Sequence, residues 1–506
     1  MSYAPKLNVT IPGDDASPGL LFISPWQLTG AGPYIYDKLG NLVWDGFGVV
    51  GPATAFNFHM CNYDGSNHLC ATLANLFQGY SVGNAIIVDS DYRVVKTVQI
   101  GGDMMPVDLH EFQLVDGGNS ALLLSYVAIP YDLSNIQTPL AETINGTSNV
   151  TIDDGLGWLM LSNFQEIDVD TGAVNFEWYS NDHVHPSEAD VGPGMYSGDG
   201  LSPRSPWDYL HINSIDKSSE GHYIVSARHT STIYYINGTS QNIIWRLNCH
   251  GGISNFTCLD SLDFAFQHDA RIHSQNSTHT ILSLFNNGGY QAYKFQERSS
   301  GMVIALDHAT NSARTLSQQH APTLQPLFSD TQGNTQLLPN GNRFHGWGNK
   351  PWISEHASDG TPLFAATYTT APYNQTAMNY RAFSFEGWQS TPANTRPSVY
   401  SYAYDCDSAN RIYVSWNGAT SVVAWNYYGT WAIGGELEFL GRDRKGREFE
   451  HYWVAGGYWP WVVVEAVGED GMGLRNSSLQ ATFVPSEGLR GACDLEGCEE
   501  ASSSSS

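Results

Sequence analysis

The sequence predicts an all-β protein, built as a single β-propeller of six blades (seven as the alternative), each a four-stranded antiparallel sheet. Charged residues make up only 14% of the 506 residues, whereas glycine occurs 50 times and aromatic residues reach 12%. This composition is typical of strands and turns rather than of long charged helices. Short apolar strands recur along almost the whole chain, and no long segment shows helical periodicity.

Two strand patterns repeat in order along the chain. In the first, an apolar strand ends in a polar turn and a second strand follows, at residues 20–44, 85–95, 166–174 and 303–307. In the second, a polar residue opens a short strand, which a glycine or asparagine turn joins to an apolar strand. This second pattern occurs at residues 110–125, 211–228, 268–283, 336–344 and 402–416. Imperfect repetition of a four-stranded antiparallel unit is typical of a β-propeller.

The repeats continue without a linker from residue 20 to about residue 485, so we predict one propeller domain over residues 1–485. A pair of β-sandwich domains would also give regular short strands and stays open as an alternative. Residues 486–506 are acidic and end in a serine run. We expect this tail to be disordered or derived from a tag, and to lie outside the fold.

The excess of acidic over basic residues limits the kinds of molecule that the protein can bind. Fifty acidic residues against 23 basic ones give a formal net charge of -27, which repels phosphates, so we expect no nucleic-acid partner. No apolar run approaches the length of a membrane helix, and we expect no membrane span. The sequence gives no indication of the oligomeric state.

Cysteine spacing favours secretion. Two pairs of cysteines are each nine residues apart and bracket polar segments, and a third pair closes a short loop near the end of the chain. We expect three local disulfides, with one cysteine left over. The expected pairs are Cys61 with Cys70, Cys249 with Cys258 and Cys493 with Cys498, and the remaining cysteine is Cys406. An acidic intracellular protein with free thiols is the alternative.

Eight Asn-X-Ser/Thr sequences add support for a secreted glycoprotein. They begin at Asn8, Asn145, Asn149, Asn237, Asn255, Asn276, Asn374 and Asn476. The first five residues do not show the charged and then apolar pattern of a signal peptide, so we expect a signal peptide to have been removed. The predicted location is extracellular.

Three of the 17 histidines occupy the same place in the repeat. His110, His211 and His268 each open the second strand pattern, at the start of an innermost strand of the predicted propeller. Equivalent ends of innermost strands converge on the mouth of the central channel. We therefore expect the three imidazoles to meet in one pocket, for which a metal site and acid–base or nucleophilic chemistry are the two functional options.

The neighbouring residues favour an anion over a metal. Asn213 lies two residues after His211, so both side chains face the same side of a strand, and Arg228 ends the next strand. Arginine, asparagine and histidine donate hydrogen bonds to the oxygens of an anion, and no paired carboxylates of the metal-ligand type accompany them. We expect no metal, and no nucleotide cofactor because no glycine-rich phosphate loop precedes a helix. Alternatively, these residues satisfy strand ends around a water-filled channel.

Several segments together resemble the arylsulfotransferase (aryl-sulfate sulfotransferase) family, and in particular its fungal branch. They cover roughly residues 20 to 480 in family order. The matching segments are residues 108–112, 207–216, 223–231, 266–271, 338–342, 346–348 and 415–419.

The resemblance implies a propeller enzyme, six-bladed in bacterial members, that transfers a sulfuryl group from a phenolic sulfate ester to another phenol. The transfer passes through a sulfated histidine and needs no adenylyl-sulfate cofactor. Carried over by motif, His268 is the histidine that becomes sulfated, while His211 and Asn213 bind the sulfuryl oxygens. Arg228 is the arginine that ends the next strand, and His110 is the earlier histidine, which would serve as acid and then base.

Aromatic residues of the matching motifs are the predicted substrate contacts, namely Trp207, Tyr209, Trp347 and Trp416. Two other functions stay open. A channel mouth lined with histidine, arginine and asparagine would also suit a lyase or hydrolase that acts on uronate-containing glycans, or a non-catalytic binding propeller. The predicted partner is therefore a phenolic small molecule or an anionic glycan.

Overall fold

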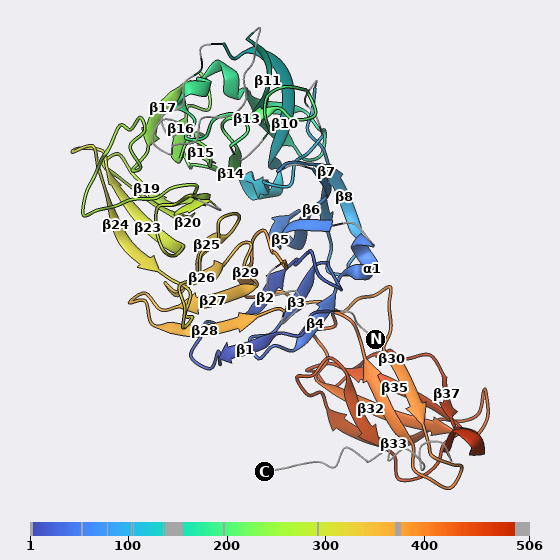
Figure 1. The fold of residues 1–506 in the computed structure, drawn as a ribbon. Coiled ribbons are helices and arrows are strands. Elements are labelled where there is room, and N and C mark those ends of the chain that lie inside the picture. Colours follow the sequence, from blue (N-terminus) through green and yellow to red (C-terminus); the bar gives the residue numbers. More distant parts are fainter. Residues whose placement is uncertain are drawn as a thin grey trace. The chain divides into compact units, whose positions relative to one another are not determined.

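The computed structural model describes residues 4–51, 54–77, 79–102, 104, 106–134, 136, 155–195, 198–290, 293–369 and 376–490. The structure is all-β, and six small sheets arranged in a ring form a six-bladed β-propeller (Figure 1). The predicted fold class and blade number are thereby confirmed. None of the described helices is long and apolar enough to cross a membrane.

Blades 1 to 3 come from the first part of the chain. Blade 1 has the strand order β29-β2-β3-β4, blade 2 runs from β5 to β8, and blade 3 runs from β9 to β12 with β13 paired to β11. The bounds are β2 (Leu20–Ile23), β3 (Tyr34–Tyr36), β4 (Leu42–Asp45), β5 (Thr54–Tyr63), β6 (Ser66–Leu76), β7 (Ser81–Val88), β8 (Val94–Val98), β9 (Phe112–Val115), β10 (Ser120–Asp132), β11 (Leu156–Asp168), β12 (Val174–Trp178), β13 (Trp207–Asp208) and β29 (Phe383–Phe385).

Blades 4 to 6 follow in sequence order. Blade 4 runs from β14 to β17, blade 5 has the order β18-β24-β23-β20-β19, and blade 6 has the order β1-β28-β27-β26-β25. The bounds are β1 (Asn8–Ile11), β14 (Ile212–Lys217), β15 (Tyr223–Ala227), β16 (Thr232–Ile236), β17 (Ile243–Leu247), β18 (Thr257–Cys258), β19 (His268–Gln275), β20 (His279–Asn286), β23 (Ser300–Asp307), β24 (Ser312–Gln319), β25 (Asn334–Leu337), β26 (Arg343–Gly346), β27 (Trp352–His356) and β28 (Pro362–Thr367).

Short elements lie between the blades. A separate two-stranded sheet pairs β21 with β22. The bounds are α1 (Phe47–Val50), η1 (Asp116–Gly118), η2 (Ser180–Asp182), η3 (Pro186–Glu188), β21 (Gly289–Tyr290) and β22 (Tyr293–Lys294).

The ring is closed by strands that lie far apart in the sequence. β29 pairs antiparallel with β2, so that Leu20 faces Phe385 and Phe22 faces Phe383. β1 continues the neighbouring blade by pairing with β28. Both ends of the propeller segment are thus fixed in sheets, which removes free strand edges that would otherwise pair with other chains.

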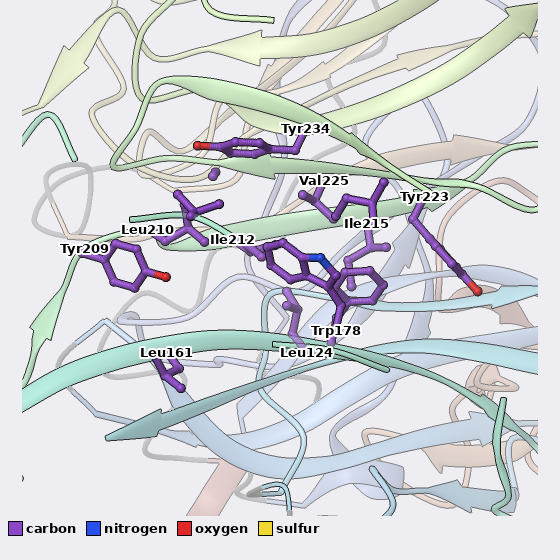
Figure 2. Packing of buried hydrophobic residues seen from close by; sticks show 14 of the residues in the cluster. Leu124, Leu161, Trp178, Tyr209, Leu210, Ile212, Ile215, Tyr223, Val225 and Tyr234 are labelled. Carbon is purple, nitrogen blue, oxygen red and sulfur yellow. The ribbon is translucent and has the colours of Figure 1, made fainter. Parts of the chain in front are cut away.

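Hydrophobic side chains hold neighbouring blades together. All residues of β15 and β16 are buried, as expected where both faces of a sheet pack against other blades. Figure 2 shows part of one such cluster, which contains Leu124, Leu161 and Trp178 of blade 3 together with Ile215 and Val225 of blade 4. Truncation of such a buried tryptophan to alanine costs about 3–5 kcal/mol.

Aspartate side chains build the turns that the first strand pattern predicted. Asp168 accepts hydrogen bonds from the backbone N–H groups of Asp170 and Thr171, and Asp307 does the same for Ala309 and Thr310. Such turns, in which the side chain replaces a backbone acceptor, join the two outer strands of blades 3 and 5.

The propeller ends earlier than the predicted boundary at residue 485. The chain divides into two compact units, residues 1–40 with 45–388 and residues 41–44 with 389–506. All six blades are complete by β29, and the later strands form a separate β unit with its own core. The strand pattern at residues 402–416 placed the predicted boundary too late in the sequence. The strands of the second unit and those of a blade share the same two-residue side-chain period, so the pattern does not distinguish them. Of the predicted tail, residues 491–506 lie outside the described residues.

The second unit has the strand order β33-β32-β35-β37-β30-β31-β34, with β36 paired to β35. Its core contains Ile412, Val414, Trp425, Val462 and Val464. The bounds are β30 (Ser398–Tyr402), β31 (Arg411–Ser415), β32 (Ala424–Thr430), β33 (Glu438–Arg444), β34 (His451–Val454), β35 (Trp461–Val467), β36 (Gly473–Asn476) and β37 (Gln480–Phe483).

Two of the three predicted disulfides are present, Cys61–Cys70 and Cys249–Cys258. Cys406 is free and exposed, as expected. Cys493 and Cys498 lie outside the described residues, as do the acceptor sites Asn145, Asn149 and Asn374. Among the other acceptor sites, Asn237 is partly buried, and those that are exposed are Asn8, Asn255, Asn276 and Asn476.

Candidate active site

Four residues predicted to be catalytic line one cavity of about 280 Å³ in the propeller. They are His110, His211, Arg228 and His268. Three of them stand at the start of the edge strands β9, β14 and β19 of blades 3, 4 and 5. Residues that are 158 positions apart in the sequence therefore meet in one concave site, the setting in which binding and catalytic groups are usually found.

Irregular backbone places these side chains. The pairing of β14 and of β19 shifts register between Ile212 and Ser214 and between His268 and Arg271. Next to these shifts, His211 and Asp269 both have a φ of 55°. A left-handed conformation at a non-glycine residue is strained and clusters at functional sites. The shifts turn the histidines toward the cavity, which is the usual effect of a β-bulge on a side chain.

Arg381 ties the strands around the channel together. Its guanidinium donates to the carbonyl oxygens of His110 and Asn213 at 3.0 and 2.7 Å, and to Glu111 Oε1 at 3.0 Å. The side chain is only 1% exposed, and its Nε lies 3.1 Å from Asp269 Oδ1. This buried cation links blades 3, 4 and 5, so it fixes the spacing of the strands that carry His110, His211 and His268.

Neighbouring residues at the starts of three strands line two different cavities. Glu111, Asp269 and Arg381 line a second cavity of about 220 Å³, while their predecessors His110, His268 and Tyr380 line the first. In Glu111, burial raises the pKa, but Arg271 and Arg381 outweigh burial and hold the pKa below its usual value.

Two histidines are each paired with an aspartate. Nδ1 of His211 donates to Asp208 Oδ2 at 2.5 Å, and Nδ1 of His110 donates to Asp108 Oδ1. The two imidazole rings meet edge to face, with 4.7 Å between their centroids. A carboxylate on Nδ1 fixes the tautomer and leaves Nε2 to exchange protons with a substrate.

His268 is held as a neutral imidazole with a defined lone pair. The backbone N–H of Gln332 donates to Nε2 at 3.1 Å, which places the ring proton on Nδ1, and Nδ1 donates to Asn287 Oδ1 at 2.7 Å. Burial and the charge of Arg228 lower the pKa of His268 well below its usual value, as neighbouring imidazoles also do. A neutral imidazole nitrogen is a good nucleophile.

Arg228 supplies the positive charge of the cavity. It donates to His229 Nε2 at 2.7 Å and to the carbonyl oxygen of Asp330 at 2.8 Å. His229 in turn donates from Nδ1 to the carbonyl oxygen of Asp208 at 2.6 Å. Burial lowers the pKa of both His211 and His229, and Arg228 lowers it further. The cavity thus combines the Arg228 cation with the neutral imidazoles of His211 and His268.

The fifth predicted catalytic residue, Asn213, is buried and is not among the residues that line the cavity. Its side chain is fully buried, and Nδ2 donates to the carbonyl oxygen of Gln267 at 2.8 Å. Gln267 directly precedes His268, so Asn213 supports the start of β19, where His268 stands. Side-chain alternation put Asn213 on the side of His211, but the irregular backbone at the start of β14 breaks that alternation.

The four aromatic residues predicted to contact substrate are packed elsewhere. Trp207 and Tyr209 are fully buried in the core between blades 3 and 4. Trp347 donates to Ser354 Oγ at 2.9 Å, and Trp416 belongs to the second unit, where it donates to Thr395 Oγ1 at 2.9 Å. Large aromatic side chains contribute most to stability when buried, so aromatic residues in a motif often serve the core.

Different apolar residues form the wall of the cavity. Trp26, Phe56, Leu109, Met378 and Tyr380 line the cavity together with the polar groups. Trp26 and Phe56 contact edge to face at a centroid distance of 5.6 Å. An apolar wall beside a cationic and imidazole-rich wall fits a ligand with an aromatic ring and an anionic head.

One group of side chains in the described ranges has the spacing of metal ligands. Asp208, His211 and His229 offer ligand atoms within 4.8 Å of one another. A cation there would face the guanidinium of Arg228, which already donates to His229. Burial raises the pKa of Asp208, and the nearby His229, His110 and Arg228 act against that rise. The group suits the orientation of imidazoles better than the binding of a metal.

A family model for arylsulfotransferases (ASST) matches residues 59–369, which is more than half of the chain. The chain belongs to the arylsulfotransferase family. This membership supports a transferase function of the arylsulfotransferase type, and the matched residues include His110, His211, Arg228 and His268. None of the curated proteins matches the sequence.

The solved structures that the comparison found are distant from this arylsulfotransferase-family chain. A protein of unknown function from Bacteroides caccae is 12% identical, with a TM-score of 0.39, covering 73% of this chain and 100% of its own. The GH43 protein BlXynB from Bacillus licheniformis is 9% identical, with a TM-score of 0.28, covering 84% and 89%. A DUF4221 family member from Bacteroides vulgatus is 9% identical, with a TM-score of 0.23, covering 72% and 87%.

Sequence reasoning missed several residues of this arylsulfotransferase-like site. Asp108 and Asp208 precede His110 and His211 by two and three residues, so the Asp-x-His and Asp-x-x-His spacings were available as a signal. Asn287 and Arg381 had no comparable signal. Asn287 follows β20, which pairs with β19 in the same blade, so it reaches His268 within one hairpin. Arg381 reaches His110 from a distant part of the chain, through a contact that only the closed ring of blades creates.

Proposed function

We propose that this protein transfers a sulfuryl group from an aryl sulfate to a phenol through a sulfated His268. One observation carries the proposal: a single cavity joins a neutral imidazole, the Arg228 cation and an apolar aromatic wall. The apolar wall would hold the aryl ring, while the sulfate lies against the polar side. Family membership gives independent support for the reaction class.

In the first step, Nε2 of His268 attacks the sulfur, and the bond from sulfur to the phenolic oxygen breaks. The electron pair of that bond leaves with the phenolic oxygen, which takes the Nε2 proton of a protonated His110 and leaves that imidazole neutral. Arg228 stabilises the charge that builds on the sulfuryl oxygens, as a preorganised donor does in a cavity of low polarity. His268 keeps its Nδ1 proton, which Asn287 accepts in a hydrogen bond.

In the second step, His110 removes the proton of the incoming phenol, and the phenolic oxygen attacks the sulfur on His268. The nitrogen–sulfur bond breaks and returns the neutral imidazole. Because Asp108 holds Nδ1 of His110, the same Nε2 gives a proton in the first step and takes one in the second. His211, which is backed by Asp208, lies beside His110 and orients it.

Gln332 must move for this reaction to begin. Its backbone N–H donates to the Nε2 lone pair that attacks, and its φ of 64° is unusual for a residue with a side chain. We propose that the incoming sulfate displaces this N–H, which then donates to a sulfuryl oxygen. Residues 330–332 line the cavity, so this local shift couples substrate entry to release of the nucleophile.

The test uses p-nitrophenyl sulfate as donor and a simple phenol as acceptor. The wild-type protein should release p-nitrophenol and sulfate the acceptor. After quenching without acceptor, the peptide that contains His268 should gain the mass of one sulfuryl group. His268→Ala should lose both signals, whereas His279→Ala, which removes a histidine that is 55% exposed, should keep both.

The remaining outcomes contradict the proposal in distinct ways. Transfer without a modified histidine would indicate direct attack by the acceptor. Activity confined to uronate-containing glycans, with new unsaturated or reducing ends, would indicate a lyase or hydrolase. Ligand binding without any turnover would indicate a binding propeller.

We further propose that the protein is secreted and glycosylated and comes from the fungal branch of the family. The two disulfides favour an oxidising compartment, and four acceptor asparagines are exposed in the described residues. Intact mass of the protein from a eukaryotic host, before and after enzymatic deglycosylation, tests this proposal. An unchanged mass would contradict it.

A further inference from the structure

Tyrosines form an ordered face on the second unit, outside the site described above. In β31, Ile412 and Val414 belong to the core, so Arg411 and Tyr413 lie on the opposite side of the strand. Tyr413 pairs in register with Tyr400 of β30 and with Tyr452 of β34. Three tyrosines therefore form one row across three neighbouring strands.

A second row lies beside the first. Tyr402 of β30 pairs with Arg411, and Arg411 pairs with Val454 of β34. We call the outward residues Tyr400, Tyr402, Tyr413 and Tyr452 the tyrosine face. Tyr400 and Tyr452 are 50% and 43% exposed, so the face is open to solvent.

The rings of the tyrosine face lie close enough to form a platform. Tyr402 and Tyr413 are nearly parallel, with 10° between their planes and 6.4 Å between centroids. Tyr413 and Tyr452 are 5.0 Å apart. Neighbouring strands are roughly 5 Å apart, so the row of three spans roughly 10 Å, a length that suits successive pyranose rings of an extended polysaccharide.

Tyrosine suits such a ligand because its ring presents an apolar face while its hydroxyl group remains solvated. The C–H face of a pyranose stacks on the ring, and the sugar hydroxyls bond to the phenol oxygens and to water. None of the three strands contains an aspartate or a glutamate. The face itself therefore carries no negative charge, in a chain whose formal net charge is -27.

We infer that the tyrosine face binds a neutral polysaccharide. The chain's net charge repels a second copy of itself, a nucleic acid and an acidic glycan, whereas an uncharged sugar chain meets no such repulsion. The second unit would then hold the enzyme on a polymer surface, independently of the reaction in the propeller cavity.

Native electrophoresis of the full chain in gels with and without a soluble neutral β-glucan tests the inference. The wild-type protein should be retarded in the β-glucan gel and not in a gel with polygalacturonate. Tyr413→Ala and Tyr452→Ala should each weaken retardation by roughly tenfold, the effect expected for loss of one aromatic stack. Tyr413→Phe keeps the ring and should keep most of the binding.

Phe439→Ala is the matched control, because Phe439 is an aromatic residue on β33 of the same unit and is 60% exposed. It should be retarded like the wild type. Equal retardation of the wild type and both tyrosine variants would overturn the inference, as would retardation by polygalacturonate alone. A wild-type dimer that Tyr413→Ala converts to a monomer in sedimentation would instead make the face a self-association surface, and would also overturn it.

Discussion

Replacing Arg381 by methionine should destabilise the propeller and disable its cavity together. Arg381 is 1% exposed and donates to the carbonyl oxygens of His110 and Asn213 and to Glu111. Methionine fills a similar length but donates no hydrogen bond. The substitution therefore leaves two buried carbonyl oxygens without this donor, and Glu111 without one of its two arginines.

The expected loss of stability follows from the burial of the ion pair between Arg381 and Glu111. Removing one partner of a buried ion pair costs about 3–5 kcal/mol, because the remaining charge stays buried. Arg271 still holds Glu111 Oε2 at 2.7 Å, so we expect a loss near the lower end, about 3 kcal/mol. In a unit of this size each kcal/mol lowers Tm by roughly 1 °C, which gives a decrease of about 3–4 °C.

Thermal unfolding followed by calorimetry and turnover of p-nitrophenyl sulfate measure the two effects. Activity should fall by at least tenfold at a temperature where the variant is fully folded, because the strands that carry His110 and His268 lose their common anchor. Arg93→Met is the control, since Arg93 is 52% exposed in its pair with Asp91 and such surface pairs contribute about 0–1 kcal/mol. Equal Tm and equal activity in Arg381→Met and the wild type would refute the reasoning.

Three further results are expected. Four buried histidines, His211, His229, His268 and His345, have pKa values well below the usual one. The unfolded chain thus binds protons that the folded chain does not, and urea titrations should show stability falling below about pH 6.5, by roughly 1 kcal/mol per pH unit and per histidine; a flat profile from pH 7 to 5 would contradict this. Trp26→Ala should raise KM for p-nitrophenyl sulfate severalfold with little change in kcat, because it removes part of the apolar wall; an unchanged KM would exclude this wall from substrate binding. Replacing Cys61 and Cys70 by serine should lower the free energy of unfolding by about 2–3 kcal/mol in denaturant titrations, and no change would show that this bridge does not constrain the unfolded chain.

Local patterns were sufficient for the fold class. Strand-turn-strand repetition predicted the propeller, because each blade is built from contiguous hairpins whose turns are encoded locally, as at Asp168 and Asp307. The disulfides Cys61–Cys70 and Cys249–Cys258 were equally accessible, since a nine-residue separation closes within one local loop. The position of His110, His211 and His268 at equivalent points of the repeat also gave the expectation that they meet, and the structure places all three in one cavity.

The tertiary structure decided where the propeller ends and which side chains reach the cavity. The last repeat shares its two-residue period with the blades, so only the packing of Ile412 and Val414 into a separate core distinguishes it. Asn213 does not line the cavity because the pairing of β14 with β15 is irregular at this residue. The sequence pattern does not predict this irregularity. Arg381 donates to the carbonyl oxygens of His110 and Asn213, which belong to other blades. These contacts form only when the ring closes, because the partners are distant in sequence and no local pattern of residues predicts that they meet.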